Sequence, residues 1–130
     1  MVEEISRILS EFTPRVLFAY VFGSTGTAME NSLSDLDVAV YLDAEAGSIE
    51  LNHKLSLYAE ISRVTKRNDI DVVILNTCSN QLLVYDIMIN GKLIYDADPG
   101  ARAVFEQQML HAAIDFKESR DRILYDTRAD

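Results

Sequence analysis

Hydrophobic positions recur with two different periods along the chain, and the period predicts each element. Residues 2–12 carry apolar side chains at helical spacing, which favours an amphipathic helix. Three short runs, VLFAYVF (16–22), LDVAVYL (36–42) and IDVVIL (70–75), are apolar and rich in β-branched or aromatic residues, which is typical of buried strands. A shorter run predicts a fourth strand over residues 93–95.

Potential capping residues predict where the two internal helices begin. We expect Ser48 to cap a helix that continues to about Arg67, because a serine hydroxyl can accept a free N–H of the first turn. We expect Asn80 to begin a second helix that ends near Ile89. Each of these helices would connect two of the predicted strands.

The C-terminal segment predicts a long final helix. Asp98 and Pro99 suit its N-cap and first helical position. Its apolar side chains at helical spacing are expected to pack on the sheet; they are Phe105, Met109, Ala112, Phe116 and Ile123. The order of elements predicts one α/β (α+β) domain over residues 1–130, with a small mixed sheet flanked by helices.

Two carboxylates stand where the second strand begins. In FGSTGTAMENSLSDLDVAVYL (22–42), Asp35 and Asp37 are two residues apart. Alternate residues of a strand share a face, so both would point one way while Leu36 points to the core. Two like charges this close raise a pKa unless a counter-charge neutralises them. A divalent cation that prefers oxygen ligands, such as Mg²⁺, would supply that charge.

Residues on either side of this pair extend the candidate site. Gly23 and Ser24 follow the first strand and could seat a phosphate, because glycine permits close approach and a helix N-terminus binds anions. No GxxxxGK[ST] is present, so this is not a P-loop. Asp71 begins the third strand and would supply a third carboxylate if strands two and three are neighbours. Three carboxylates can hold two metal ions for in-line displacement at phosphorus, and the third can take the acceptor's proton.

These residues resemble the signature of the polymerase-β-like nucleotidyltransferase superfamily: Gly-Ser, ten residues, then Asp-x-Asp between two strands. The short chain resembles the minimal nucleotidyltransferase (MNT) antitoxins, the MntA group. That resemblance implies catalytic and metal-binding roles for Asp35, Asp37 and Asp71, with two Mg²⁺ ions. It implies that Gly23 and Ser24 hold the nucleotide. It also implies transfer of AMP from ATP to a tyrosine of a HEPN-domain RNase toxin, which would form a hetero-oligomer with this chain.

The loop departs from the pattern of that superfamily. Many members carry an arginine soon after Gly-Ser, whereas TGTAMENSLS (25–34) has no basic residue. We therefore expect a base from elsewhere in the chain to meet the triphosphate charge. The candidates are Lys54, Arg63, Lys66 and Arg67.

Composition narrows the classes of function. The formal net charge of -9 argues against a nucleic-acid binder, including a tRNA-modifying enzyme, because phosphates attract a basic face. An acidic surface suits a basic protein partner. With one cysteine, Cys78, no internal disulfide can form, which favours a reducing compartment. The acidic N-terminus and the lack of a long apolar stretch favour a cytoplasmic protein without membrane contact.

Plainer interpretations exist for several residues. Asp35 and Asp37 could belong to a solvated turn with a capping aspartate, and Asp69 is expected to be a turn residue. His53 and His111 lie on predicted helices without metal-like partners, so we expect surface or structural roles. Two other functions remain open. One is an antitoxin that neutralises its toxin by contact alone, and the other is a nucleotidyltransferase for a small molecule such as an aminoglycoside.

Overall fold

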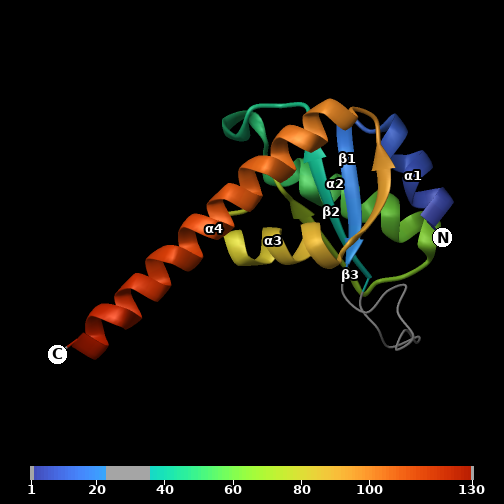
Figure 1. The fold of residues 1–130 in the computed structure, drawn as a ribbon. Helices are drawn as coiled ribbons and strands as arrows, with labels where there is room; N and C mark the ends of the chain where they lie inside the picture. The colour runs from blue at the N-terminus through green and yellow to red at the C-terminus, as the bar shows by residue number, and fades with distance from the viewer. Residues whose placement is uncertain (1, 23–35, 130) are drawn as a thin grey trace.

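Four strands form one mixed sheet in the order β3-β2-β1-β4 (Figure 1). The structure, a computed structural model, describes residues 2–22 and 36–129, with backbone alone over 116–129. The elements are α1 (Val2–Glu11), β1 (Val16–Phe22), β2 (Leu36–Leu42), the 3-10 turn η1 (Ala46–Ser48), α2 (Leu51–Thr65), β3 (Ile70–Ile74), α3 (Gln81–Asn90), β4 (Lys92–Asp96) and α4 (Pro99–Ala129). This confirms the predicted α/β architecture and the long C-terminal helix.

The central strand β1 pairs antiparallel with β2 on one side and β4 on the other. Strands β2 and β3 are parallel, because α2 returns the chain to the end of the sheet where β2 began. The first three strands have the expected bounds within one residue, since most of the apolar side chains in these runs are buried. Strand β4 extends one residue beyond the prediction at each end.

Helices cover both faces of the sheet and close two hydrophobic cores. The first core joins α1 and α2 to one face, and its fully buried members include Ile5, Leu9, Leu57 and Ile61. The second core joins α3 and α4 to the other face through Val84, Ile87, Phe105 and Phe18. Phe105 and Met109 pack on this core as predicted, whereas the side chains of Phe116 and Ile123 lie outside the described part.

The helix caps confirm two of the predictions made from the sequence and contradict one. Asn80 accepts the Leu83 N–H at 3.1 Å at the start of α3, and Asp98 accepts the Ala101 N–H at 3.0 Å at the start of α4. The prediction that Ser48 caps α2 is wrong, because Ser48 ends η1 and its hydroxyl bonds back to the Glu45 carbonyl at 2.8 Å.

A different residue pair defines the start of α2. The residue before the helix is Glu50, and its N–H donates to Nδ1 of His53 at 3.0 Å. His53 therefore has a structural role, as expected. Its imidazole satisfies a backbone N–H that the first turn of the helix would otherwise leave without a partner.

A polar network fastens α4 to the sheet. The Tyr20 hydroxyl of β1 donates to Glu106 of α4 at 2.6 Å, and Arg102 donates to Asp96 at 2.9 Å and to Glu106 at 3.2 Å. The pKa of Tyr20 is raised above its ordinary value, first by burial and then by the hydrogen bond and charge of Glu106.

In the part of the chain that the structure describes, no helix has the length and hydrophobicity to cross a bilayer.

Candidate functional site

Three strand ends meet at the edge of the sheet where the sequence predicts its site. Phe22, the last residue of β1, is the register partner of Asp37, the second residue of β2. Asp37 is in turn the register partner of Asp71, the second residue of β3. In Figure 1 this is the lower end of the sheet. The structure therefore brings together two of the three carboxylates that the sequence singles out.

The two aspartates also share a face of the sheet. Their neighbours in β2 and β3 are Leu36, Val38, Ile70 and Val72, all of which are buried in the core beneath α1 and α2. Because side chains alternate along a strand, Asp37 and Asp71 stand on the opposite face, which α3 and α4 cover further along. Neighbouring strands lie about 4.8 Å apart, so one cation can contact a carboxylate from each.

This arrangement fits a hard divalent cation. Asp71 is exposed and Asp37 is partly buried, and both offer the oxygen ligands that Mg²⁺ prefers. Two aspartates on adjacent strands repel each other, and a cation between them removes that repulsion. Among the side chains that the structure describes, no group of three or more acidic, histidine or cysteine residues is gathered for a metal. A metal ion bound here would therefore need ligands besides Asp37 and Asp71.

The remaining predicted site residues, Gly23, Ser24 and Asp35, lie outside the described residues. Their assignment as nucleotide and metal ligands stays a prediction. The described chain does fix their flanks, because β1 ends at Phe22 and β2 begins at Leu36, and these strands are paired. The connection that carries the three residues therefore leaves and re-enters the sheet at the edge that holds Asp37 and Asp71.

The four candidate bases occupy different places. Lys54 lines a cavity beside the start of α3, and Lys66 lines one between α1 and α2. Arg63 pairs with Glu60 on the exposed side of α2 at 2.9 Å. Arg67 lies just ahead of β3, close in sequence to Asp71. Of these four, Arg67 is the one that the structure brings to the strand ends where the site is predicted.

Arg67 forms a two-pronged contact that the sequence did not reveal. Its Nε and Nη2 atoms donate to the two carboxylate oxygens of Asp69 at 2.8 and 2.7 Å. These hydrogen bonds hold the pKa of Asp69 below its ordinary value. The Asp69 carbonyl accepts the N–H of Leu36 at 3.1 Å, which ties the start of β2 to the approach of β3. Asp69 is thus more than the turn residue that we expected.

Comparisons with known proteins agree with this fold. A family model described as "Polymerase beta, Nucleotidyltransferase" matches residues 3–100. The chain is similar to the protein adenylyltransferase MntA of Aphanizomenon flos-aquae, with 29% identity over 122 residues that cover 88% of this chain and 80% of that protein.

Solved structures show the same fold. A chain from a crystal structure of a toxin–antitoxin variant, MntA–HpeT, superposes with a TM-score of 0.76 at 20% identity, covering 98% of each chain. A chain from a toxin–antitoxin crystal structure with AMP-PNP superposes with a TM-score of 0.79 at 20% identity, covering 97% of each chain. At this level of identity, these likenesses establish the architecture.

Proposed function

This chain belongs to the polymerase β nucleotidyltransferase family, and on that premise we propose that it is an antitoxin that transfers AMP from ATP to a protein. The acceptor in this proposal is a tyrosine hydroxyl of a HEPN-domain RNase toxin, which the modification neutralises. The observation that carries the proposal is the register pairing of Asp37 with Asp71 at the edge where β1 also ends. We place the protein in the cytoplasm, where ATP and such a toxin would meet.

The proposed roles follow from the chemistry of the residues. Asp35 and Asp37 would hold two magnesium ions, and Asp71 would share one of them. When bound, these ions supply charge neutralisation for the triphosphate and polarise the α-phosphorus. Gly23 and Ser24 would hold the pyrophosphate end through backbone N–H groups and the serine hydroxyl. Arg67 stands nearest in the chain to Asp71 among the candidate bases and would add positive charge.

The transfer itself needs one proton acceptor and one leaving group. Asp71 would take the proton as the acceptor hydroxyl attacks the α-phosphorus. A new bond joins the hydroxyl oxygen to the α-phosphorus. The bond to the bridging oxygen breaks, and pyrophosphate leaves with that electron pair. Asp71 suits the role because it is exposed at the strand end, within reach of an incoming side chain.

Two kinds of similarity support a toxin as the partner and ATP as the nucleotide. The similar chain from Aphanizomenon flos-aquae is named a protein adenylyltransferase, and the superposed structures are toxin–antitoxin complexes, one with AMP-PNP. The resemblance to the MNT antitoxins supplies the HEPN toxin and the tyrosine. A formal charge of -9 on this chain suits a basic protein partner.

The resemblance to the MNT antitoxins implies that the toxin is encoded beside this chain. The test is an intact-mass spectrum of the protein encoded by the adjacent gene after incubation with this chain, ATP and Mg²⁺. We expect mass steps of one AMP on that protein. The Asp37→Asn/Asp71→Asn variant should give none, because it removes both carboxylates while keeping their shape. Glu3→Gln/Glu4→Gln is the matched control, because it removes two exposed charges from α1 on the other face of the sheet.

Each rival has its own signature in the same experiment. If the wild-type chain and the Asp37→Asn/Asp71→Asn variant both bind the neighbouring protein tightly and neither changes its mass, the chain is an antitoxin that acts by contact alone. The absence of a basic residue from 25–34 is the feature that favours this second candidate. No transfer to the neighbouring protein, but transfer to an aminoglycoside, would replace the protein acceptor with a small molecule.

A further inference from the structure

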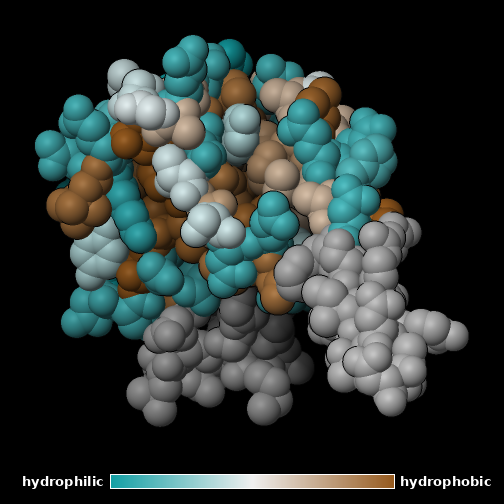
Figure 2. Space-filling model, turned by 90° about the vertical axis from the view of Figure 1, so that its left-hand side faces the viewer, coloured by the Kyte–Doolittle hydropathy of each residue, from teal (hydrophilic) through white to brown (hydrophobic). Residues whose placement is uncertain are grey.

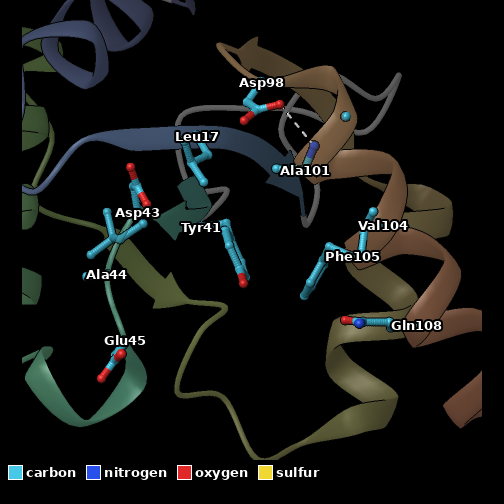
Figure 3. A pocket seen from close by; sticks show the side chains of 12 residues that line it. Leu17, Tyr41, Asp43, Ala44, Glu45, Asp98, Ala101, Val104, Phe105 and Gln108 are labelled. Carbon is cyan, nitrogen blue, oxygen red and sulfur yellow. Dashed lines mark hydrogen bonds between the residues drawn. The ribbon is translucent and has the colours of Figure 1, made fainter.

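A groove lies at the end of the sheet opposite Asp37, between the segment after β2 and the first turns of α4. Its volume is about 660 Å³, and its lining includes Tyr41, Asp43, Glu45, Asp98 and Phe105 (Figure 3). A second hollow of about 410 Å³ continues it toward the start of α3. The two share Tyr41, Ala44, Glu45, Phe105 and Gln108. Figure 2, which faces this side, shows apolar surface inside a hollow bordered by hydrophilic side chains.

The floor of the groove is aromatic and fixed by packing. Tyr41 stacks on the buried ring of Phe18, with centroids 4.9 Å apart and planes 5° from parallel. The Phe105 ring stands 5.1 Å from Tyr41 at 53°. Phe105 is buried and Tyr41 is partly exposed, so one face of the cluster remains open to a ligand. Aromatic faces held this way attract cations as well as apolar stems.

The rim of the groove is acidic, and hydrogen bonds hold the backbone of the segment that carries it. Asp43, Glu45 and Asp98 line it, and no Lys, Arg or His belongs to the lining of either hollow. Ion pairs among the described residues involve other carboxylates, so these three have no cation from that part of the chain. The Asn76 amide bonds to both backbone groups of Leu42 at 2.8 Å, which holds the segment that carries the rim.

We propose that this groove is the docking site for a basic segment of the protein partner. An arginine or lysine of the partner lays its alkyl stem and cationic head on Tyr41 and Phe105, and the rim carboxylates meet the charge. A second copy of this chain fits poorly, because it would bring another charge of -9 against an acidic rim. The identity of the partner rests on the proposed function.

The groove is separate from the predicted catalytic edge. Asp37 and Asp43 are six residues apart along an extended segment, which spans about 20 Å at about 3.3 Å per residue. A partner that reached both the groove and the predicted catalytic edge would have to span the length of β2. Binding in the groove and transfer at the edge can therefore be measured independently.

The test measures the dissociation constant for the purified product of the adjacent gene by calorimetry, at low and high salt. Asp43→Asn/Glu45→Gln should weaken binding about tenfold and reduce its salt dependence, because two exposed charge contacts are lost. Ala44→Arg places a cation in the groove and should weaken binding at least as much. Glu3→Gln/Glu4→Gln has the same change in net charge, lies on α1, and should bind like wild type. Circular dichroism and thermal unfolding confirm that each variant folds.

The outcomes separate this proposal from the proposed function. If the groove and α1 variants weaken binding equally, or if neither weakens it, the groove is not the docking site. AMP transfer by the wild-type chain would still uphold the proposed function in that case. Groove-dependent binding without AMP transfer upholds the groove and overturns the enzyme. Failure of the wild-type chain to bind the neighbouring protein overturns the docking site. Sedimentation showing a wild-type dimer that Ala44→Arg disrupts would assign the groove to a second copy instead.

Discussion

Asp37 on β2 and Asp71 on β3 are register partners in a parallel pair of strands and stand on one face of the sheet. Apolar register pairs on both sides of these aspartates hold the strands together, from Leu36 and Ile70 before them to Val40 and Ile74 after them. That packing keeps the two carboxylates side by side against their mutual repulsion. A cation that bound both would relieve the repulsion, so we expect folding and metal binding to be coupled at this edge.

Magnesium should therefore stabilise the folded chain. At a free concentration 100-fold above the dissociation constant, the free energy of unfolding should rise by about 2.7 kcal/mol. Thermal unfolding with and without MgCl₂ measures this gain, with NaCl matched for ionic strength. In Asp37→Asn the gain in the free energy of unfolding from magnesium should fall sharply, because one of the two carboxylates for the ion is lost. An equal gain in wild type and variant would mean that the ion binds elsewhere.

Asp71→Asn should affect transfer more than binding. Removing a general base typically lowers a rate by about 10²- to 10⁴-fold, so AMP transfer should fall in that range. Asp35 and Asp37 remain in this variant, so nucleotide binding by calorimetry should persist with weaker magnesium affinity. If Asp71→Asn kept its transfer rate across the pH range, another group would have to accept the proton.

Tyr20 should give the chain a distinctive loss of stability at high pH. Burial, followed by the hydrogen bond and charge of Glu106, raises the pKa of Tyr20 in the folded state. Below pH 10 both states keep the proton, so this residue adds no pH dependence. Above about pH 10 the unfolded chain releases it first, and the free energy of unfolding should fall by about 1.4 kcal/mol per pH unit.

Tyr20→Phe isolates this contribution. Denaturant unfolding between pH 8 and 11.5 should show a difference between wild type and variant that shrinks as the pH rises, because the variant lacks the ionising hydroxyl. Near pH 8 the variant should be less stable by about 1 kcal/mol, the usual value of a lost hydrogen bond. Parallel pH curves for the two proteins would show that Tyr20 ionises normally.

A side chain at Gly91 should destabilise the fold. It follows α3 and donates its N–H to the Ile87 carbonyl at 2.7 Å. A Cβ on Gly91 would lie 2.3 Å from that carbonyl oxygen, so the end of the helix would have to shift. Gly91→Ala should lower the free energy of unfolding by about 1–3 kcal/mol in a denaturant titration. Gly47→Ala is the control, because no atom lies within 4 Å of its added Cβ, and its effect should stay within about 0.5 kcal/mol.

The sequence predicted the strands better than the connections between them. Apolar runs such as Val16–Phe22 predict strands well, because β-branched and aromatic residues favour a strand and this strand is buried on both faces. The cap of α2 was assigned wrongly to Ser48, because Glu50 and His53 complete it together and glutamate is not a favoured N-cap. Local propensity carries no information about such a side-chain pair.

The candidate site divides in the same way. The position of Asp37 and Asp71 at strand starts followed from pattern, but their register depends on how α2 returns the chain and could not be read from spacing. The Arg67–Asp69 pair was missed because it needs the turn at Lys66, whose φ of 57° is unusual for a residue other than glycine. Gly23, Ser24 and Asp35 remain predictions from the motif.

Arg102 should contribute strongly to the stability of the contact between α4 and the sheet. It bonds to Asp96 and Glu106, and its pKa is raised above its ordinary value, chiefly by the hydrogen bond to Asp96. Asp96 Oδ1 is buried without a hydrogen-bond partner among the described residues, so Arg102 carries much of the compensation for that carboxylate. Arg102→Met should therefore lower the free energy of unfolding by about 2–3 kcal/mol, because it leaves a carboxylate buried and unpaired.

A double-mutant cycle separates the lost pair from the lost packing. Asp96→Asn should cost less than Arg102→Met, because a neutral amide needs no cation, and Arg102→Met/Asp96→Asn should be less destabilised than the sum of the single variants. Both side chains are mostly buried, at 28% and 20% exposure, so salt should screen this coupling weakly. Arg63→Met, which breaks the exposed pair with Glu60, should cost under about 1 kcal/mol. Additive effects of the Arg102 and Asp96 substitutions would instead mean that α4 is held by its apolar contacts, with Phe105 as the main anchor.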